Sequence, residues 1–227
     1  MQSRMTQNCF IFGAGVYDAA ADGSLLPLPV FPAPGDLVIA ADGGLSAVRR
    51  LGIKPKLIIG DFDSLGHVPE AACGEELLQL PVEKDDTDMR AAMREGMSRG
   101  CSVFHLYGGM GGRIDHTLAN IQCLAWLAAN GCRGYLFGGG NALTAIRNER
   151  FAIPKGLPFS LRRGTLSLFA QGGDAHGVTV AGLAYTLQNA VLYRDIPLGV
   201  SNEYRGGNAE ITVADGTLLA VLPMEIQ

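Results

Sequence analysis

The sequence lacks the features that mark several common protein classes. It has 18 lysines and arginines against 22 acidic residues, for a formal charge of −4, and no run of basic residues. Nucleic acid is not an expected partner, because binding it requires basic residues that neutralise phosphates. No segment approaches the roughly 20 apolar residues of a membrane helix, and no secretory signal pattern occurs. These absences predict a cytoplasmic protein with no membrane partner.

Cysteine and histidine patterns are also uninformative. The five cysteines form an odd set with no C-x-x-C pair, which argues against a disulfide framework and against a zinc site. There is no G-x-S-x-G motif, and the four histidines have no spacing that indicates a catalytic triad or a metal site. Apolar residues make up 48% of the chain, so there is ample material for a globular core.

The first 140 residues have the pattern of an α/β domain. Short apolar runs predict buried strands at 9–12, 37–40, 57–59, 103–107 and 135–137. Two helices are expected between them. The first, at 88–99, carries a core-facing stripe of Met89, Met93 and Met97. The second, at 117–129, turns Leu118, Ile121, Leu124, Ala125 and Ala128 inward and ends at Asn130-Gly131. This alternation predicts a Rossmann-like parallel sheet in a domain of residues 1–140.

The chain changes character after three consecutive glycines at 138–140. From residue 141 no helical period is found, and glycine, proline and aspartate turns separate short strand-like stretches. Strands are predicted at 142–147, 165–169, 190–193, 210–213 and 218–222. We therefore expect a second domain, residues 141–227, with an all-β sandwich fold.

Two acidic segments follow expected strands of the parallel sheet. Asp42 lies in A-D-G-G, residues 41–44, and Asp61 and Asp63 lie in G-D-F-D-S, residues 60–64. Such sheets hold ligands at the carboxyl ends of their strands. Side chains at i and i+2 of an extended chain share a face, so the two aspartates of the second segment are expected to meet one cation. The alternatives are an ordinary glycine turn in the first segment and a solvated Asx turn in the second.

A third acidic segment, K-D-D-T-D at residues 84–88, leads into the first expected helix. Either Thr87 or Asp88 fits the N-cap of that helix, but a cap accounts for only one acid. Asp85 and Asp88 have the spacing favoured for a ligand site, and Lys84 is placed to steady a phosphate as a point charge. Oxygen ligands in this number favour Mg²⁺, which keeps its waters and bridges phosphates.

The fourth segment, G-G-M-G-G-R-I-D-H at residues 108–116, is dominated by glycine. Backbone N–H groups around Gly111 and Gly112 are expected at a helix N-terminus, where anions bind, and Arg113 adds a permanent positive charge. The pattern predicts a phosphate site, although it is not a Walker A loop. Asp115 is interpreted as either a further ligand or a helix cap.

The four segments, in this order and at these separations, resemble the catalytic domain of the thiamine pyrophosphokinase family. Two later segments, G-L-A-Y-T-L-Q-N-A-V-L at 182–192 and G-V-S-N-E at 199–203, resemble the thiamine-binding part of that family. The resemblance implies a homodimer whose thiamine pocket is completed across the subunit interface. It also implies transfer of diphosphate from ATP, the co-substrate, to the hydroxyl of thiamine, with release of AMP.

The resemblance also assigns roles to individual residues. Asp61, Asp63 and Asp88 match the carboxylates that bind Mg²⁺ and ATP in the family, and Arg113 joins them as a catalytic residue. The positions that match other substrate-binding residues are Asp42, Lys84, Asp85, Gly111, Gly112, Asp115, Tyr185, Ser201 and Asn202. Tyr185 takes the place of an aromatic residue, Trp in the animal enzymes, that stacks on the pyrimidine ring of thiamine.

Two other functions remain open on the sequence. A related diphosphotransferase acting on another heterocyclic alcohol, such as a hydroxymethyl-pterin, would share the aspartates and differ in the β domain. A non-catalytic sensor of thiamine or nucleotide would bind without turnover. The sensor has less support, because it has no need for several clustered carboxylates that repel one another.

Overall fold

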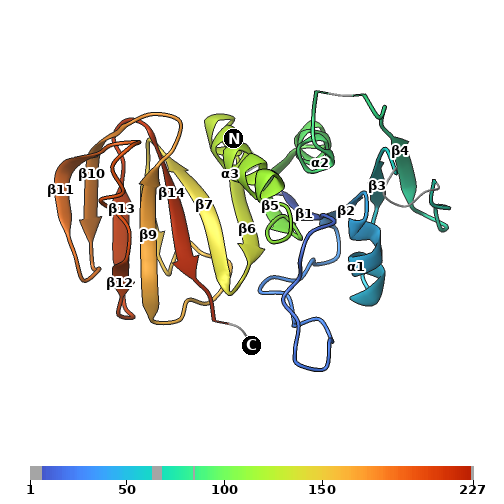
Figure 1. Cartoon of the computed structure of the whole chain (residues 1–227), viewed down its shortest axis with the longest axis horizontal. Coiled ribbons are helices and arrows are strands. Elements are labelled where there is room, and N and C mark those ends of the chain that lie inside the picture. The colour runs from blue at the N-terminus through green and yellow to red at the C-terminus, as the bar shows by residue number, and fades with distance from the viewer. Residues whose placement is uncertain (1–6, 63–67, 84, 226–227) are drawn as a thin grey trace. The chain divides into compact units, whose positions relative to one another are not determined.

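The structure of the chain is a computed structural model that describes residues 7–62, 68–83 and 85–225 (Figure 1). Asp63 and Lys84 lie outside the described residues. The helices are α1 (Gly44–Arg50), α2 (Asp88–Ser98) and α3 (Ile114–Ala129). The strands are β1 (Gln7–Phe12), β2 (Leu37–Ala41), β3 (Leu57–Gly60), β4 (Glu76–Gln79), β5 (Cys101–Tyr107), β6 (Arg133–Gly138), β7 (Asn141–Arg147), β8 (Arg150–Ile153), β9 (Gly164–Ala170), β10 (Ala175–Ala181), β11 (Leu187–Leu192), β12 (Asn202–Tyr204), β13 (Ala209–Thr212) and β14 (Thr217–Pro223).

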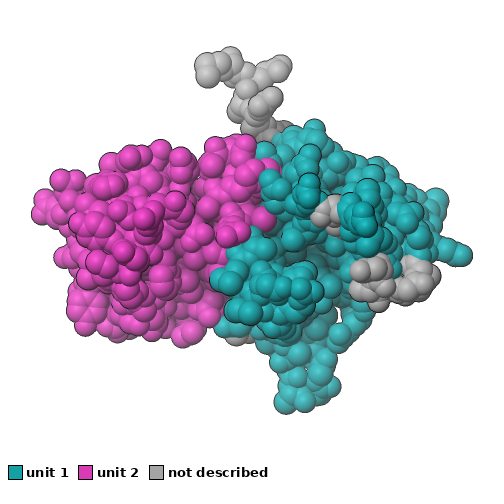
Figure 2. Space-filling view, turned by 45° about the horizontal axis from the view of Figure 1, so that its top comes forward, with its two compact units in different colours: residues 1–26, 31–120, 136–139 teal, residues 27–30, 121–135, 140–227 magenta. Residues whose placement is uncertain are grey.

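The strands form a mixed sheet of ten and a small antiparallel sheet of four. The hydrogen-bonded order of the large sheet is β12-β9-β14-β7-β6-β5-β1-β2-β3-β4, and that of the small sheet is β11-β10-β13-β8. The chain divides into two compact units, coloured separately in Figure 2. The first comprises residues 1–26, 31–120 and 136–139, and the second comprises residues 27–30, 121–135 and 140–227.

The first unit contains the parallel part of the sheet. Strands β5, β1, β2, β3 and β4 pair in parallel, and the apolar runs of the sequence predicted all of these strands except β4. Every residue of β2 and β3 is buried, which is typical of parallel strands that are covered on both faces. Helix α2 contacts several of these strands and buries Met89 and Met93 against them, while Met97 is half-buried. The predicted methionine stripe therefore belongs to the core.

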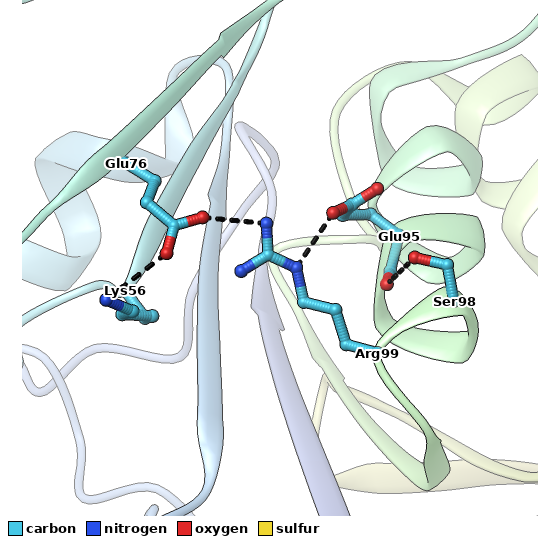
Figure 3. A network of polar contacts seen from close by, with 5 residues as sticks. All are labelled: Lys56, Glu76, Glu95, Ser98 and Arg99. Atoms are coloured by element: carbon cyan, nitrogen blue, oxygen red, sulfur yellow. Dashed lines mark hydrogen bonds and ion pairs between the residues drawn. The ribbon is translucent and has the colours of Figure 1, made fainter.

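Strand β4 was not predicted, because every one of its residues is exposed and its sequence has no buried pattern. A polar network holds this edge strand in place (Figure 3). The Glu76 carboxylate of β4 forms ion pairs with Lys56 at 3.2 Å and with Arg99 at 2.8 Å. Arg99 also forms an ion pair with Glu95 of α2 at 2.8 Å. The hydrogen bonds from Arg99 and from Lys56 lower the pKa of the Glu76 carboxyl below its ordinary value.

The second expected helix is longer than predicted. Helix α3 begins at Ile114 and not at residue 117, and it ends before Gly131, whose φ of +72° is the predicted left-handed stop. Leu124 is fully buried as expected, but the inward orientation predicted for Leu118 is wrong, because this side chain is 56% exposed. In the part of the chain that the structure describes, no helix is long and apolar enough to cross a membrane.

The second unit is built mainly from antiparallel strands. Strand β14 pairs with both β7 and β9, and β12 pairs with β9. The small sheet supplies β8, β10, β11 and β13. The expected absence of helices holds for residues 141–225. The Rossmann-like and sandwich descriptions, and a domain boundary at residue 140, stay predictions.

Candidate active site

Asp42 and Asp61 come together at the carboxyl edge of the parallel sheet. The register pairs Ala41 of β2 with Ile59 of β3, and the Asp42 N–H donates to the Ile59 carbonyl at 2.8 Å. A Cβ added to Gly60 would lie 3.1 Å from the Cα of Asp42. A glycine at this position thus lets the two strand ends approach, so Asp42 and Asp61 follow neighbouring strands at the same edge of the sheet.

The backbone of the G-D-F-D-S segment turns at its phenylalanine. Phe62 has a φ of +61°, although its side chain is 2% exposed and therefore packed in the core. The backbone is therefore not extended at Phe62, the residue between Asp61 and Asp63. Asp61 lies among the described residues and Asp63 does not, so their assignment as joint cation ligands stays a prediction.

Thr87 is the N-cap of α2. Its Oγ1 accepts a hydrogen bond from the Arg90 N–H at 3.2 Å, so Asp88 is the first helical residue and not the cap. An acid in the first turn also interacts favourably with the helix dipole. The cap thus places the Asp88 carboxylate at the positive end of a helix whose first turn packs against the sheet.

The neighbouring acids of the third segment have different surroundings. Asp86 pairs with Arg90 at 2.9 Å and with Arg94 at 3.4 Å, whereas Asp85 is exposed. Both aspartates line a cavity of about 270 Å³ together with Leu80, Pro81, Arg90, Ala91 and Arg94. Two arginine pairs engage Asp86, which leaves Asp85 as the more accessible carboxylate of this segment.

Two glycine-containing loops bind each other through their backbones. The N–H of Gly15 donates to the Gly108 carbonyl at 2.8 Å, and that of Val16 donates to the Met110 carbonyl at 3.1 Å. A Cβ at Gly15 would lie 2.5 Å from the Gly108 oxygen, so no side chain fits there. Nothing in the sequence pattern of residues 13–15 had indicated this contact with the glycine-rich segment at residues 108–112.

Further contacts join the glycine-rich segment at residues 108–112 to the first turn of α2 and to α3. A Cβ at Gly13 would lie 2.6 Å from the Met89 Cε, and one at Gly109 would lie 3.5 Å from the same atom. The buried Asn120 donates from Nδ2 to the Gly109 carbonyl at 2.7 Å. Nothing in the sequence pattern had singled out Asn120, because an asparagine inside a helix has no local signature for a tertiary contact.

Arg113 and Asp115 form a two-point ion pair at the start of α3. Arg113 donates from Nε to Oδ1 of Asp115 at 3.2 Å and from Nη2 to Oδ2 at 2.6 Å. The side chains are 73% and 60% exposed. The hydrogen bonds within this pair raise the pKa of Arg113 and lower that of Asp115. Gly111 and Gly112 have φ values of +77° and +68°, which few other residues adopt.

The residues expected to contact thiamine lie in the second unit. The Tyr185 side chain is 70% exposed, and the Asn202 amide hydrogen-bonds to the Tyr185 backbone in both directions, at 2.9 and 2.7 Å. Ser201 has a φ of +61°, and its N–H donates to the Ser167 Oγ at 3.0 Å. The structure therefore brings Asn202 to the backbone of the exposed Tyr185, and Ser201 precedes Asn202 in the chain.

The donor set in the first unit fits a hard cation. Asp61, which the resemblance assigned to Mg²⁺, follows β3 beside Asp42 at the neighbouring strand end, and carboxylate oxygens are the ligand type that Mg²⁺ takes. Among the described residues, no group of three or more potential ligands is close enough to form an all-protein cage.

Comparisons with known proteins agree with this arrangement. Residues 33–136 match the family model described as the catalytic domain of thiamin pyrophosphokinase, and residues 157–218 match its vitamin B1 binding domain. The thiamine pyrophosphokinase of Bacillus subtilis (strain 168) is 27% identical over 190 residues, which cover 82% of this chain and 86% of that protein.

Solved structures show the same fold. The thiamine pyrophosphokinase structure from Bacillus subtilis superposes with a TM-score of 0.79 at 23% identity, covering 96% of this chain and 100% of that chain. The yeast thiamin pyrophosphokinase gives a TM-score of 0.73 at 16% identity, covering 99% of this chain and 88% of that one. With both of its domain models matched in the expected order, the chain belongs to the thiamin pyrophosphokinase family.

Proposed function

We propose that the protein transfers diphosphate from ATP to the hydroxyl of thiamine, forming thiamine diphosphate and AMP. The observation that carries this proposal is the pairing of Asp42 and Asp61 at adjacent strand ends, in the same unit as a glycine loop braced by the segment after β1. Carboxylates for a cation and backbone N–H groups for phosphates are the two requirements for handling ATP.

Each group has a role in the proposed transfer. A bond forms between the thiamine oxygen and the β-phosphorus of ATP, and the bond from that phosphorus to the α,β-bridging oxygen breaks, so that AMP leaves. Asp61 and Asp88, with Asp63, would hold Mg²⁺, which would supply positive charge to stabilise the phosphates. Asp42, Lys84 and Asp85 line the ATP site. Arg113 contributes a planar cationic fork, and a carboxylate accepts the hydroxyl proton.

Binding of thiamine is assigned to the second unit. The exposed ring of Tyr185 is available for stacking on the pyrimidine, and Ser201 lies at the turn before β12.

We also propose a cytoplasmic homodimer. Four apolar side chains of the segment 193–200 are 41–60% exposed, namely Tyr193, Ile196, Leu198 and Val200. Such a patch is typical of a surface that another subunit covers.

The proposal is tested by measuring AMP release with two alternative acceptors, thiamine and a hydroxymethyl-pterin. We expect turnover with thiamine that requires Mg²⁺ and is at least about 100-fold slower in Asp61→Asn, because the change removes one carboxylate charge and keeps the shape. Asp22→Asn is the matched control, since this exposed carboxyl in the same unit accepts hydrogen bonds from the N–H and the Oγ of Ser24, at 2.9 and 2.6 Å. AMP release with the pterin alone would favour the related diphosphotransferase, and thiamine binding without turnover would favour the sensor.

A further inference from the structure

The side chain of Asn202 is engaged by backbone groups on both of its polar atoms. Its Oδ1 accepts from the Tyr185 N–H at 2.9 Å and from the Glu203 N–H at 2.8 Å, and its Nδ2 donates to the Tyr185 carbonyl at 2.7 Å. An amide oxygen has two lone pairs, and an amide nitrogen has two N–H donors. The acceptor capacity of Asn202 is thus filled by the protein itself, and one of its donors is used as well.

The segment that carries Tyr185 is fixed at several other points. It runs from residue 182 to 186 between β10 and β11. A Cβ on Gly182 would collide with the Asn208 carbonyl oxygen, and Leu183 is buried. The N–H of Ala184 donates to the Glu203 carbonyl at 3.0 Å. Asn202 makes two bonds to the backbone of the following residue, Tyr185. The backbone is therefore held in place from Gly182 to the exposed tyrosine.

Asn202 is itself held by the large sheet. It is the first residue of β12, where it pairs with Leu166 of β9, and the preceding Ser201 donates its N–H to the Ser167 Oγ at 3.0 Å. Ser167 is buried. The amide of Asn202 therefore connects a loop of the small sheet to an anchored edge strand of the large one, within the second unit.

We propose that Asn202 is a positioning residue, which fixes the backbone of Tyr185 so that its exposed ring has one orientation for stacking on an aromatic ring of the substrate. The proposal rests on the proposed function and changes the role that the sequence gave to Asn202, from a thiamine contact to a support. A ring that is 70% exposed has little packing of its own to orient it, so a fixed backbone reduces the ordering needed on binding.

A double-mutant cycle on thiamine affinity separates support from contact. Thiamine binding to the full chain is measured by calorimetry without ATP, for Asn202→Ala, Tyr185→Ala and the double variant. Loss of an aromatic pair weakens binding by roughly two- to thirteenfold, and we expect Asn202→Ala to fall in this range. If Asn202 acts through the ring, the double variant binds no more weakly than Tyr185→Ala alone.

Two further variants guard against a general loss of structure. Asn202→Asp keeps both acceptor bonds and loses the bond to the Tyr185 carbonyl, so its affinity is expected between wild type and Asn202→Ala. Asn148→Gly is the matched control. It removes another asparagine–backbone bond of the same unit, from the Gly216 N–H at 2.8 Å, and keeps the φ of +49° accessible. This control should bind thiamine like wild type.

The outcomes are distinct. Effects of Asn202→Ala and Tyr185→Ala that multiply in the double variant would show direct contact with thiamine and overturn the proposal, as would unchanged affinity in Asn202→Ala. The KM for ATP should stay at the wild-type value in every variant that turns over. Failure of the wild-type protein itself to bind thiamine would overturn the proposed function, and the role of Asn202 with it.

Discussion

Arg113 holds its guanidinium fork in a two-point pair with Asp115, and both side chains remain largely exposed. An exposed pair of this kind contributes little to stability, so its planar geometry is available to a phosphate when ATP replaces the carboxylate. We expect Arg113→Lys to raise the KM for ATP about tenfold and to leave the KM for thiamine nearly unchanged, because an ammonium group cannot bind two oxygens in one plane. Initial rates at varied ATP and varied thiamine measure the two constants.

Arg150→Lys is the control for this prediction. Arg150 is also 73% exposed and pairs with a carboxylate, Glu210, in the second unit. It should keep the wild-type constants for both substrates. Equal effects of Arg113→Lys on ATP and thiamine would instead assign Arg113 to the support of the glycine loop.

The buried side chain of His105 is expected to make the stability of the protein depend on pH. It is 2% exposed and stacks on Phe10, with ring centroids 4.4 Å apart, and burial lowers its pKa from 6.5 to about 4 against a smaller opposing effect of Asp36. Between these pKa values the unfolded chain binds a proton and the folded chain does not. The contribution of His105 to the free energy of unfolding is therefore complete above pH 6.5 and falls by about 3 kcal/mol as the pH drops to 4.

Chemical denaturation of wild type and His105→Phe across pH 4 to 7 measures this contribution. Phenylalanine keeps a flat ring against Phe10 and does not titrate. As the pH falls from 7 to 4, the free energy of unfolding should therefore decrease by about 3 kcal/mol less in the variant than in wild type. The exposed His176 provides the control, and His176→Gln should keep the wild-type slope. Identical slopes for wild type and His105→Phe would contradict the assignment.

At the scale of the element, the N-cap of α2 connects stability to the site. Thr87→Ala removes the hydrogen bond from the Arg90 N–H, and we expect a loss of about 1 kcal/mol in the free energy of unfolding. Fraying of the first turn also displaces Asp88, so the KM for ATP should rise. Urea unfolding and initial rates measure the two effects. Ser98→Ala, which removes a bond to the Glu95 carbonyl in the last turn, should change neither by much.

The elements that the sequence predicted are those with a strong periodic or apolar signal. Strands β2 and β3 were found because they are continuous apolar runs, and the cap of α2 was among the expected alternatives. Helix α1 has seven residues and begins at a glycine, so its pattern is too short to detect. Leu118 was misplaced because a helical period gives the relative orientation of side chains and not which of them meet a neighbour.

At the scale of the whole molecule, the sequence could place Asp42 and Asp61 at strand ends because each follows a short, continuous apolar run. It could not supply the register that brings Asp42 beside Gly60, nor the left-handed backbone at Phe62, since both depend on tertiary packing. The bond from Asn202 to Tyr185 has the same origin, because it joins residues 17 positions apart through a side chain.

The proposed homodimer leads to a complementation experiment. If the thiamine pocket is completed across the subunit interface, one chain supplies Asp61 and its partner supplies Tyr185. A heterodimer of Asp61→Asn and Tyr185→Ala chains then has one site with both lesions and one with neither, because the two sites of a two-fold dimer are equivalent by symmetry. At limiting thiamine, where the weakened binding of Tyr185→Ala lowers the rate, we expect mixed, subunit-exchanged chains to recover up to about half of the wild-type activity, averaged over the two sites of the heterodimer. Native mass spectrometry confirms exchange, and AMP release measures recovery. Exchange without recovery would place Asp61 and Tyr185 of one chain in the same site, since each site of the heterodimer would then retain one lesion.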